Sequence, residues 1–333
     1  MKKSLLALAV AAALPAAAFA QTNVQLYGIG DANITVANDD ASTNGDTQFQ
    51  MRDGTQSGSR VGVQGSEDLG GGLSANFRFE LGLDVDDGDG EGKLFGRQAR
   101  VGLKGGFGEI RFGRQYTPIF YSSIKYDYSG FGWHNNQFAI AGSAGRLDNM
   151  IEYRNKFGGV QMILMAAPTE SADQDEDDFI YGLSGNYSGG AWGIGAGYHS
   201  EGAAQNVFHL GGNFQLGAVG LGINYGLADR DGGSERTDLN FSVGVKIGAS
   251  GNLVANILMQ EDDAATTNGA GDAVNVNDRL RVGLSYGHAM SKRTNWYVSL
   301  GISDFDDENT GAAQGADDGT SPTLVSVGVR HKF

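Results

Sequence analysis

The feature that most constrains this chain is a repeated segment of about ten residues in which apolar and polar side chains alternate. In the C-terminal segment, Val325, Val327 and Val329 share one side, while Ser326 and Arg330 share the other. Successive side chains of a β-strand point to opposite faces, so such a strand has one apolar and one polar face. The pattern predicts an all-β fold, but it suits both a soluble sandwich and a barrel in a membrane.

The lengths of the connections favour the barrel. Seven short connections lie at residues 69–72, 105–107, 157–159, 188–190, 216–218, 248–251 and 290–293. Eight long ones lie near residues 37–57, 84–94, 117–146, 168–177, 201–205, 230–236, 262–277 and 305–321. The two kinds alternate, and fifteen connections join sixteen strands. We therefore expect a 16-stranded antiparallel transmembrane β-barrel, with short turns at one rim and long loops at the other. Closure also leaves no unpaired strand edge in lipid.

The N-terminus has the organisation of an export signal. Lys2 and Lys3 precede an apolar run over residues 5–14, and Ala18 and Ala20 form an A-x-A cleavage site. The run is too short to cross a bilayer as a helix. We expect a cleaved signal peptide at residues 1–20 and one barrel domain at residues 21–333.

Composition excludes several classes of protein. An exported chain with no cysteine is not a disulfide scaffold. A formal charge of −15 argues against nucleic acid as a partner, because bulk charge would repel it.

The third long connection differs from the acidic loops around it. It has about thirty residues without a helical or strand period, a length that compact domains rarely hold without a function. Its aromatic residues include Tyr116, Tyr121, Tyr126 and Trp133. We expect this segment to fold inward and to narrow a water-filled lumen.

Several stretches resemble the trimeric general porins of Gram-negative bacteria, of the β-proteobacterial type that includes the neisserial porins. They are Val-Gln-Leu-Tyr-Gly at residues 24–28, Ser-Arg-Val-Gly-Val-Gln-Gly-Ser-Glu-Asp-Leu-Gly-Gly-Gly-Leu at 59–73, Phe-Gly-Arg-Gln-Ala-Arg-Val-Gly-Leu-Lys-Gly-Gly-Phe-Gly-Glu-Ile-Arg-Phe-Gly-Arg-Gln at 95–115, and Val-Gly-Val-Arg-His-Lys-Phe at 327–333. The resemblance implies a homotrimer in the outer membrane whose third loop bends into each lumen. It also implies that Phe333 forms part of an assembly signal read by the barrel-assembly machinery. The Pro-Glu-Phe-Gly sequence common in the third loop of enterobacterial porins is absent.

Charge is sorted by position, with acids in the long loops and cations on the polar face of the strands. A charge on the lipid side would cost about 2–4 kcal/mol at midplane, so these cations are expected to face an aqueous lumen. In the resembling family, wall arginines face acids of the third loop. The residues expected at the pore constriction are Arg60, Arg78, Arg100, Arg114, Arg146, Lys104, Glu80 and Asp127.

The strict alternation of side chains between the two faces of a strand complicates the assignment of two arginines to the lumen. Strict alternation from Ile110 and Phe112 turns Arg114 outward, so the backbone must change at the loop entry, and Arg97 raises the same difficulty. Because acids are few near the third loop, we expect the narrow zone to be net positive and to favour anions. The alternative is that these arginines pair with lumen acids and stiffen the wall.

The sequence thus predicts a diffusion porin for ions and small hydrophilic solutes. An adhesin or receptor acting through its loops is the alternative. No Gly-x-Ser-x-Gly or His-Glu-x-x-His motif supports an enzyme. No tight cofactor or metal is expected. The acidic outer loops would hold Ca²⁺ or Mg²⁺ only loosely, bridging to lipopolysaccharide, since residues 84–91 match a calcium loop only in part.

Overall fold

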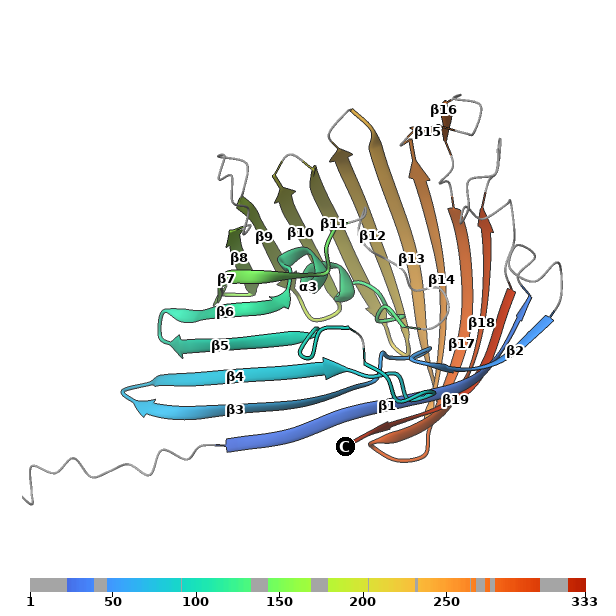
Figure 1. Cartoon of the computed structure of the whole chain (residues 1–333), viewed down its shortest axis with the longest axis horizontal. Helices are drawn as coiled ribbons and strands as arrows, with labels where there is room; N and C mark the ends of the chain where they lie inside the picture. Colours follow the sequence, from blue (N-terminus) through green and yellow to red (C-terminus); the bar gives the residue numbers. More distant parts are fainter. Residues whose placement is uncertain are drawn as a thin grey trace, which may run out of the picture.

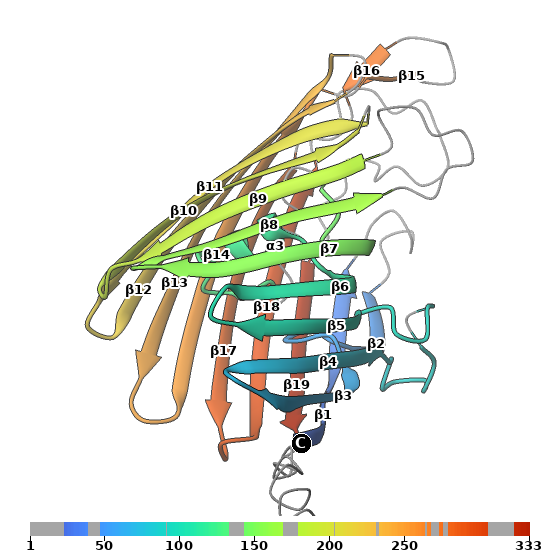
Figure 2. The same ribbon diagram turned by 90° about the vertical axis from the view of Figure 1, so that its left-hand side faces the viewer.

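The strands close into one antiparallel barrel (Figures 1 and 2). The computed structural model describes residues 23–38, 47–90, 92–132, 143–168, 179–202, 204–230, 233–263, 265–267, 273–275, 279–305 and 323–333. Each strand pairs with its neighbours along the chain, and β1 closes the ring by pairing with β19. The predicted signal peptide at residues 1–20 lies outside the described residues.

The elements of the wall are short and long strands joined in sequence. They are β1 (Asn23–Asn38), β2 (Thr47–Asp53), β3 (Arg60–Gly70), β4 (Leu73–Gly82), β5 (Gln98–Gly105), β6 (Gly108–Tyr116), β7 (Arg146–Phe157), β8 (Val160–Pro168), β9 (Phe179–Ser188), β10 (Trp192–Glu201), β11 (Gln205–Leu216), β12 (Val219–Arg230), β13 (Glu235–Ile247), β14 (Gly251–Asp262), β17 (Arg279–Ala289), β18 (Thr294–Phe305) and β19 (Thr323–Lys332). The hairpin of β15 (Ala265–Thr267) and β16 (Ala273–Asn275) forms a separate small sheet.

Seventeen strand segments occupy sixteen positions, because one position is split. β2 pairs with one half of β1, from Ala32 opposite Asp53, and β3 pairs with the other half, from Ile29 opposite Arg60. Together β2 and β3 are one interrupted strand. The 16-stranded barrel is thus confirmed, but the expected loop at residues 37–57 is too long, since residues 47–53 belong to the wall.

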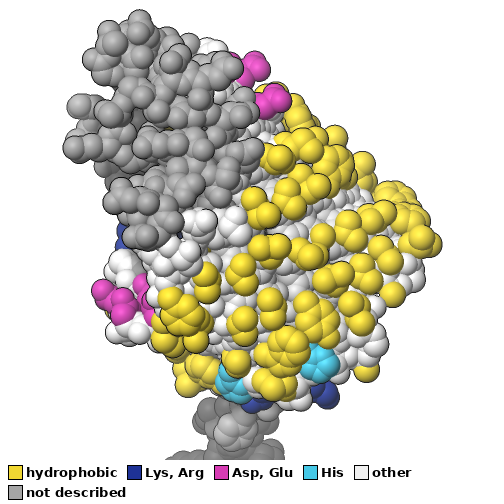
Figure 3. Space-filling view, turned by 90° about the vertical axis from the view of Figure 1, so that its right-hand side faces the viewer, with side chains coloured by type: hydrophobic (Ala, Val, Ile, Leu, Met, Phe, Trp, Pro, Cys, Tyr) yellow, Lys and Arg dark blue, Asp and Glu magenta, His cyan; other side chains and the backbone are white. Residues whose placement is uncertain are grey.

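The alternation in the sequence matches the two faces of the wall. The side chains of Val327 and Val329 on β19 are exposed on the outside, whereas Ser326 is fully buried on the lumen side. Figure 3 shows hydrophobic side chains over the middle of the outer face, with the visible charged groups toward its ends. In the part of the chain that the structure describes, no helix is long and apolar enough to cross a membrane.

The barrel closes at the C-terminus. Phe333 N donates to Gly28 O at 3.1 Å, and Gly28 N donates to Phe333 O at the same distance. A Cβ atom at Gly28 would lie 2.6 Å from an atom of the Phe333 ring, so a larger residue there would displace the ring from this position. The residue expected as the assembly signal therefore lies at the seam between the first and last strands.

Candidate functional site: the pore constriction

The third long connection enters the barrel as a short helix, α3 (Pro118–Ile124), which lies inside the ring of strands (Figure 1). Thr117 caps the helix, because its Oγ1 accepts a hydrogen bond from Phe120 N at 3.3 Å. Pro118 follows at the first helical position, where its missing N–H leaves nothing unpaired. The Tyr116 to Pro118 junction thus turns the chain from the wall into the lumen.

An apolar contact holds α3 against the far wall. Ile119 is 0% exposed and packs with Val207 of β11, Ala228 of β12 and Leu258 of β14. Phe131 packs against the same cluster from the other end of the loop. These wall residues lie at polar-face positions of their strands, so the cluster is an apolar island in a wetted lumen, and its burial favours the inward position of the loop.

Two tyrosines of the loop lie on a surface made of backbone. Tyr126 is 0% exposed, and its hydroxyl donates to Asn186 Oδ1 at 3.1 Å. A Cβ at Gly195 would lie 2.6 Å from the Tyr126 hydroxyl oxygen, and one at Gly211 would lie 2.6 Å from the same ring. Tyr128 lies over Gly244 in the same way, 2.8 Å from an added Cβ. We call this surface the glycine floor; its members on β10 to β13 are Gly193, Gly195, Gly211, Gly220, Gly222 and Gly244.

The loop also contacts the side of the lumen that lies across from the glycine floor. A Cβ at Gly132 would overlap the backbone oxygen of Gln56, in the interruption between β2 and β3. That interruption is held by Asp31, whose Oδ2 accepts from Gln56 N at 2.9 Å and from Ser57 N at 2.6 Å. Asp31 Oδ1 accepts from the Tyr297 hydroxyl at 2.5 Å. Residues 118–132 therefore bridge the lumen from the glycine floor to the inward segment 54–59.

Asp127 does not line the passage, contrary to the expectation from the sequence. Its side chain is 6% exposed and accepts hydrogen bonds from Ser129 N at 2.9 Å, Ser129 Oγ at 2.5 Å and Phe131 N at 3.1 Å. Burial raises the pKa of the Asp127 carboxyl, and these hydrogen bonds oppose that shift. Burial likewise raises the pKa of the neighbouring Tyr126 to about 12. Asp127 therefore fixes the fold of the loop instead of placing a charge in the passage.

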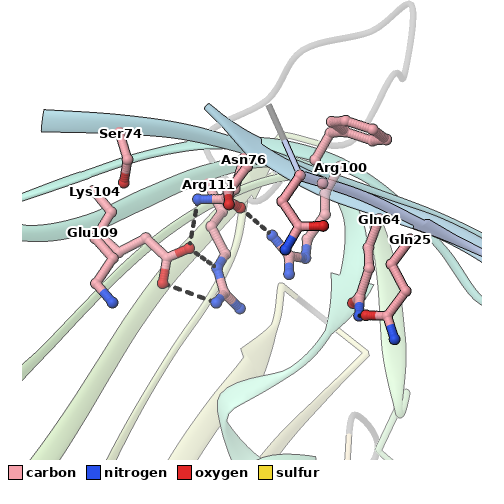
Figure 4. Close-up of a pocket in the computed structure, with 12 residues that line it drawn as sticks. Gln25, Gln64, Ser74, Asn76, Arg100, Lys104, Glu109 and Arg111 are labelled. Carbon is pink, nitrogen blue, oxygen red and sulfur yellow. Dashed lines mark hydrogen bonds and ion pairs between the residues drawn. The ribbon is translucent and has the colours of Figure 1, made fainter. Parts of the chain in front are cut away.

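Facing the loop, a row of arginines runs across β3 to β7. We call this set the arginine wall; its members are Arg60, Arg78, Arg97, Arg100, Arg111, Arg146 and Arg154. Arg78 and Arg100 lie directly opposite each other across β4 and β5. Arg78 donates to Gln64 Oε1. Arg100 Nη1 donates to Asn76 Oδ1 at 2.9 Å (Figure 4).

Three carboxylates are interspersed in the arginine wall. Glu80 accepts from Arg97 Nε at 3.1 Å and from the Tyr27 hydroxyl at 2.7 Å. Arg111 binds Glu109 through two hydrogen bonds, of 2.7 and 2.8 Å. Glu152 lies 2.5 Å from Arg154 NH2 in the third ion pair. Part of the alternative interpretation therefore holds, since three of the arginines, Arg97, Arg111 and Arg154, pair with lumen acids. Arg111 also lies 3.7 Å from Glu152.

The two entry tyrosines connect the loop to the arginine wall. The guanidinium carbon of Arg146 lies 4.2 Å from the centre of the Tyr116 ring, and that of Arg154 lies 4.7 Å from the centre of the Tyr121 ring. Stacking of Tyr116 on Phe120, with ring centres 4.0 Å apart, keeps these rings in place. The structure thus brings Tyr116 and Tyr121 to the arginines, whereas Trp133 lies outside the described residues.

Arg114 lies apart from the arginine wall. The register of β6 against β7 shifts between Gly113 and Gln115, and Gly113 has a φ of 115°, so the backbone does change at the loop entry. Arg114 nevertheless donates to Gly96 O at 2.5 Å and to Asp148 Oδ1 at 2.8 Å, and Asp148 also binds Lys93 at 2.6 Å. Arg97, by contrast, reaches the lumen acid Glu80 despite its parity, because it precedes the first residue of β5.

The arginine wall carries seven guanidinium groups against the three carboxylates of Glu80, Glu109 and Glu152, an excess of four positive charges. Arg111, Arg154, Glu109 and Glu152 were placed on the polar face by the sequence but not assigned to the constriction. The alternation of side chains along β6 and β7 is the signal that could have found them. The sequence does not show that Arg154 contacts Tyr121 or that the four residues form ion pairs with one another. Among the described residues, no group of three or more His, Asp or Glu side chains is placed to hold a metal ion.

Known proteins resemble this chain in sequence and in fold. The sequence profile of the Gram-negative porin family matches residues 7–308. Outer membrane porin protein 32 of Delftia acidovorans is 33% identical, and the major outer membrane protein P.IB of Neisseria meningitidis serogroup B is 29% identical, each over the whole of both chains. The solved anion-selective porin from Comamonas acidovorans superposes with a TM-score of 0.77 at 28% identity, covering 94% of this chain and 100% of that one.

Salmonella typhi OmpF, at 16% identity and a TM-score of 0.68 over 93% of this chain, shares the fold. The predicted resemblance to porins of the β-proteobacterial type is confirmed by the family profile and by the Delftia and Neisseria relatives. With its closed sixteen-strand wall and inward loop, the chain belongs to the Gram-negative porin family and is an outer-membrane β-barrel protein.

Proposed function

We propose that the chain forms a passive diffusion channel that favours small anions over cations of the same size. The observation that carries this proposal is the excess of positive charge on the arginine wall, directly opposite the bridging loop. Fixed charges beside a narrow aqueous passage, with low-dielectric protein around it, raise the local concentration of counter-ions. The anion selectivity of the solved Comamonas porin supports the same proposal.

The position of the loop strengthens this argument. One side of the lumen is filled by the apolar cluster at Ile119 and by the rings that lie on the glycine floor. A solute is therefore directed along Tyr116, Tyr121 and the arginines that they contact. The carboxylate of Asp127, buried within the loop, adds little opposing charge to this route.

We further propose that three copies assemble, as the family resemblance implies, and that Phe333 belongs to the signal read by the assembly machinery. The proposed trimer is consistent with the broad apolar outer face, part of which three copies would cover. The acidic outer loops would contact lipopolysaccharide through loosely bound divalent cations. These partners follow from the sequence and family, and the expected channel activity does not depend on them.

The direct test is the reversal potential of the refolded protein in a planar bilayer with a potassium chloride gradient. We expect the sign of the reversal potential to show that chloride permeates more readily than potassium. A potential of the opposite sign would contradict the proposal, and membranes without conductance would contradict channel formation itself. Conductance steps in groups of three would support the trimer.

A further inference from the structure

A second group of cations lies at the short-turn end of the lumen, beyond the arginine wall. It surrounds a cavity of about 480 Å³ at the C-terminal end of α3. Lys104 comes from β5, Lys125 follows the last residue of α3, and Lys156 comes from β7, next to Arg154 of the arginine wall. Lys104 therefore lies at this end of the lumen and not at the constriction, contrary to the expectation from the sequence. Lys104 and Glu109 also border a neighbouring cavity of about 410 Å³, which includes Arg100 and Arg111 (Figure 4). The two cavities therefore connect the arginine wall to the opening of the lumen at the short-turn end, which we call the short-turn mouth.

The lining of this cavity includes the ammonium groups of Lys104, Lys125 and Lys156. Within the described part of the chain, no carboxylate forms an ion pair with Lys104, Lys125 or Lys156. The acid in the lining, Glu109, already accepts hydrogen bonds from Arg111 and from Asn76 Nδ2. Burial, and to a smaller extent the neighbouring charge of Lys156, lower the pKa of Lys125.

Neutral donors complete the lining. Asn186 accepts hydrogen bonds at Oδ1 from Ser122 at 2.9 Å and from Tyr126 at 3.1 Å, which leaves its amide nitrogen available as a donor. Gln161 lies on the same side of the cavity. A cavity with three cations and amide donors fits an oxyanion with several acceptor atoms better than it fits a halide.

We propose that Lys104, Lys125 and Lys156 form a binding site for small solutes that carry two or more negative charges on phosphate or carboxylate oxygens. The site rests on the proposed anion-favouring channel and adds a preference within it. The arginine wall attracts anions of any valence, whereas three ammonium groups around one cavity favour multivalent ones, because each additional charge on the solute interacts with all three. Multivalent anions would therefore dwell at the short-turn mouth, and chloride would pass.

The test uses refolded protein in a planar bilayer at constant ionic strength, with inorganic pyrophosphate as the probe. Pyrophosphate added at the short-turn side should reduce the chloride current at lower concentration than pyrophosphate added at the loop side. Coulomb's law in water gives about a fourfold effect per pair of unit charges at ~5 Å. The double variant Lys125→Gln with Lys156→Gln should therefore raise the half-blocking concentration at least tenfold.

Lys246→Gln is the matched control. Lys246 lies on the polar face of β13 near the short turn, but it is not part of the cavity lining. Its replacement should change the half-blocking concentration by less than twofold. Equal block in the double variant and the unmodified protein would overturn the site, and so would an equal increase in the control.

The reversal potential separates the two proposals. If the unmodified channel favours chloride while the double variant loses only the pyrophosphate block, both the channel preference and the site stand. If the unmodified channel favours chloride but the double variant blocks normally, only the site is overturned. A preference for potassium in the unmodified channel would overturn the proposed function whatever pyrophosphate does.

Discussion

Replacement of Tyr126 by alanine tests whether the glycine floor holds the loop. The Tyr126 side chain is fully buried against β10 and β11, and its hydroxyl donates to Asn186. Truncating a fully buried aromatic side chain costs about 3–5 kcal/mol. If this loss falls on the attachment of the loop, the population of detached loops rises between about a hundred and a few thousand times, since 1.4 kcal/mol is a factor of ten.

The matched variant Tyr126→Phe keeps the ring and removes one hydrogen bond, worth about 1 kcal/mol. Asn186 retains its contact with Ser122 in both variants. The alanine variant should therefore show larger open-channel current fluctuations and faster proteolysis within residues 118–132, whereas the phenylalanine variant should resemble the unmodified protein. Heat-modifiability on gels checks that the barrel itself remains folded.

The reasoning is refuted if Tyr126→Ala shows the same fluctuations and the same cleavage rate as Tyr126→Phe. That result would mean that the ring adds little to the attachment and that the apolar cluster at Ile119 holds the loop without it. The predicted gain in mobility would then have to appear in Ile119→Ala.

Three further predictions concern charge, the inward segment and closure. Arg100→Gln should lower the chloride-to-potassium permeability ratio about sevenfold, because a unit charge ~7 Å from a passing ion is worth about 0.6 kcal/mol in water and acts with opposite sign on the two ions; an unchanged reversal potential would contradict the assigned position. Asp31→Ala leaves the N–H groups of Gln56 and Ser57 without their acceptor, at a cost of about 1–3 kcal/mol each. Protease should then cut within residues 54–59. If the variant resists cleavage there as well as the unmodified protein does, Asp31 does not hold this segment in place. Gly28→Val should reduce the refolding yield measured by gel shift, because its side chain would displace the Phe333 ring; an undiminished yield would show that this ring does not guide closure.

The number of strands could be predicted from the sequence because two independent regularities agree. Alternation fixes which side chains face outward, and the lengths of the connections fix which rim each turn occupies. The split of the second strand was missed because Gly54, Gly58 and the polar residues between them read as part of a loop. Yet Phe49 and Met51, both exposed on the outside, already alternate with Gln48, Gln50 and Arg52.

The constriction was less predictable than the wall. Its structure depends on contacts between side chains that are far apart in the sequence, and not on the alternation of residues along each strand. Parity placed Arg78 and Arg100 on the lumen side, where the structure has them. It could not show that Arg114 would bind Asp148, since that pairing depends on the shifted register at Gly113. A sequence also shows the charge of Asp127 but not the three hydrogen bonds that occupy it.

The glycine floor restricts which substitutions can change the width of this channel. Where a loop packs against side chains, either partner can be enlarged or trimmed to adjust the fit. At the glycine floor, by contrast, Tyr126 and Tyr128 lie on backbone, and an added Cβ at Gly195 or Gly211 would overlap the side chain of Tyr126. Substitutions that widen or narrow the passage should therefore be tolerated on the exposed edge of the loop and on the arginine wall. Almost no substitution should be tolerated at the glycine floor.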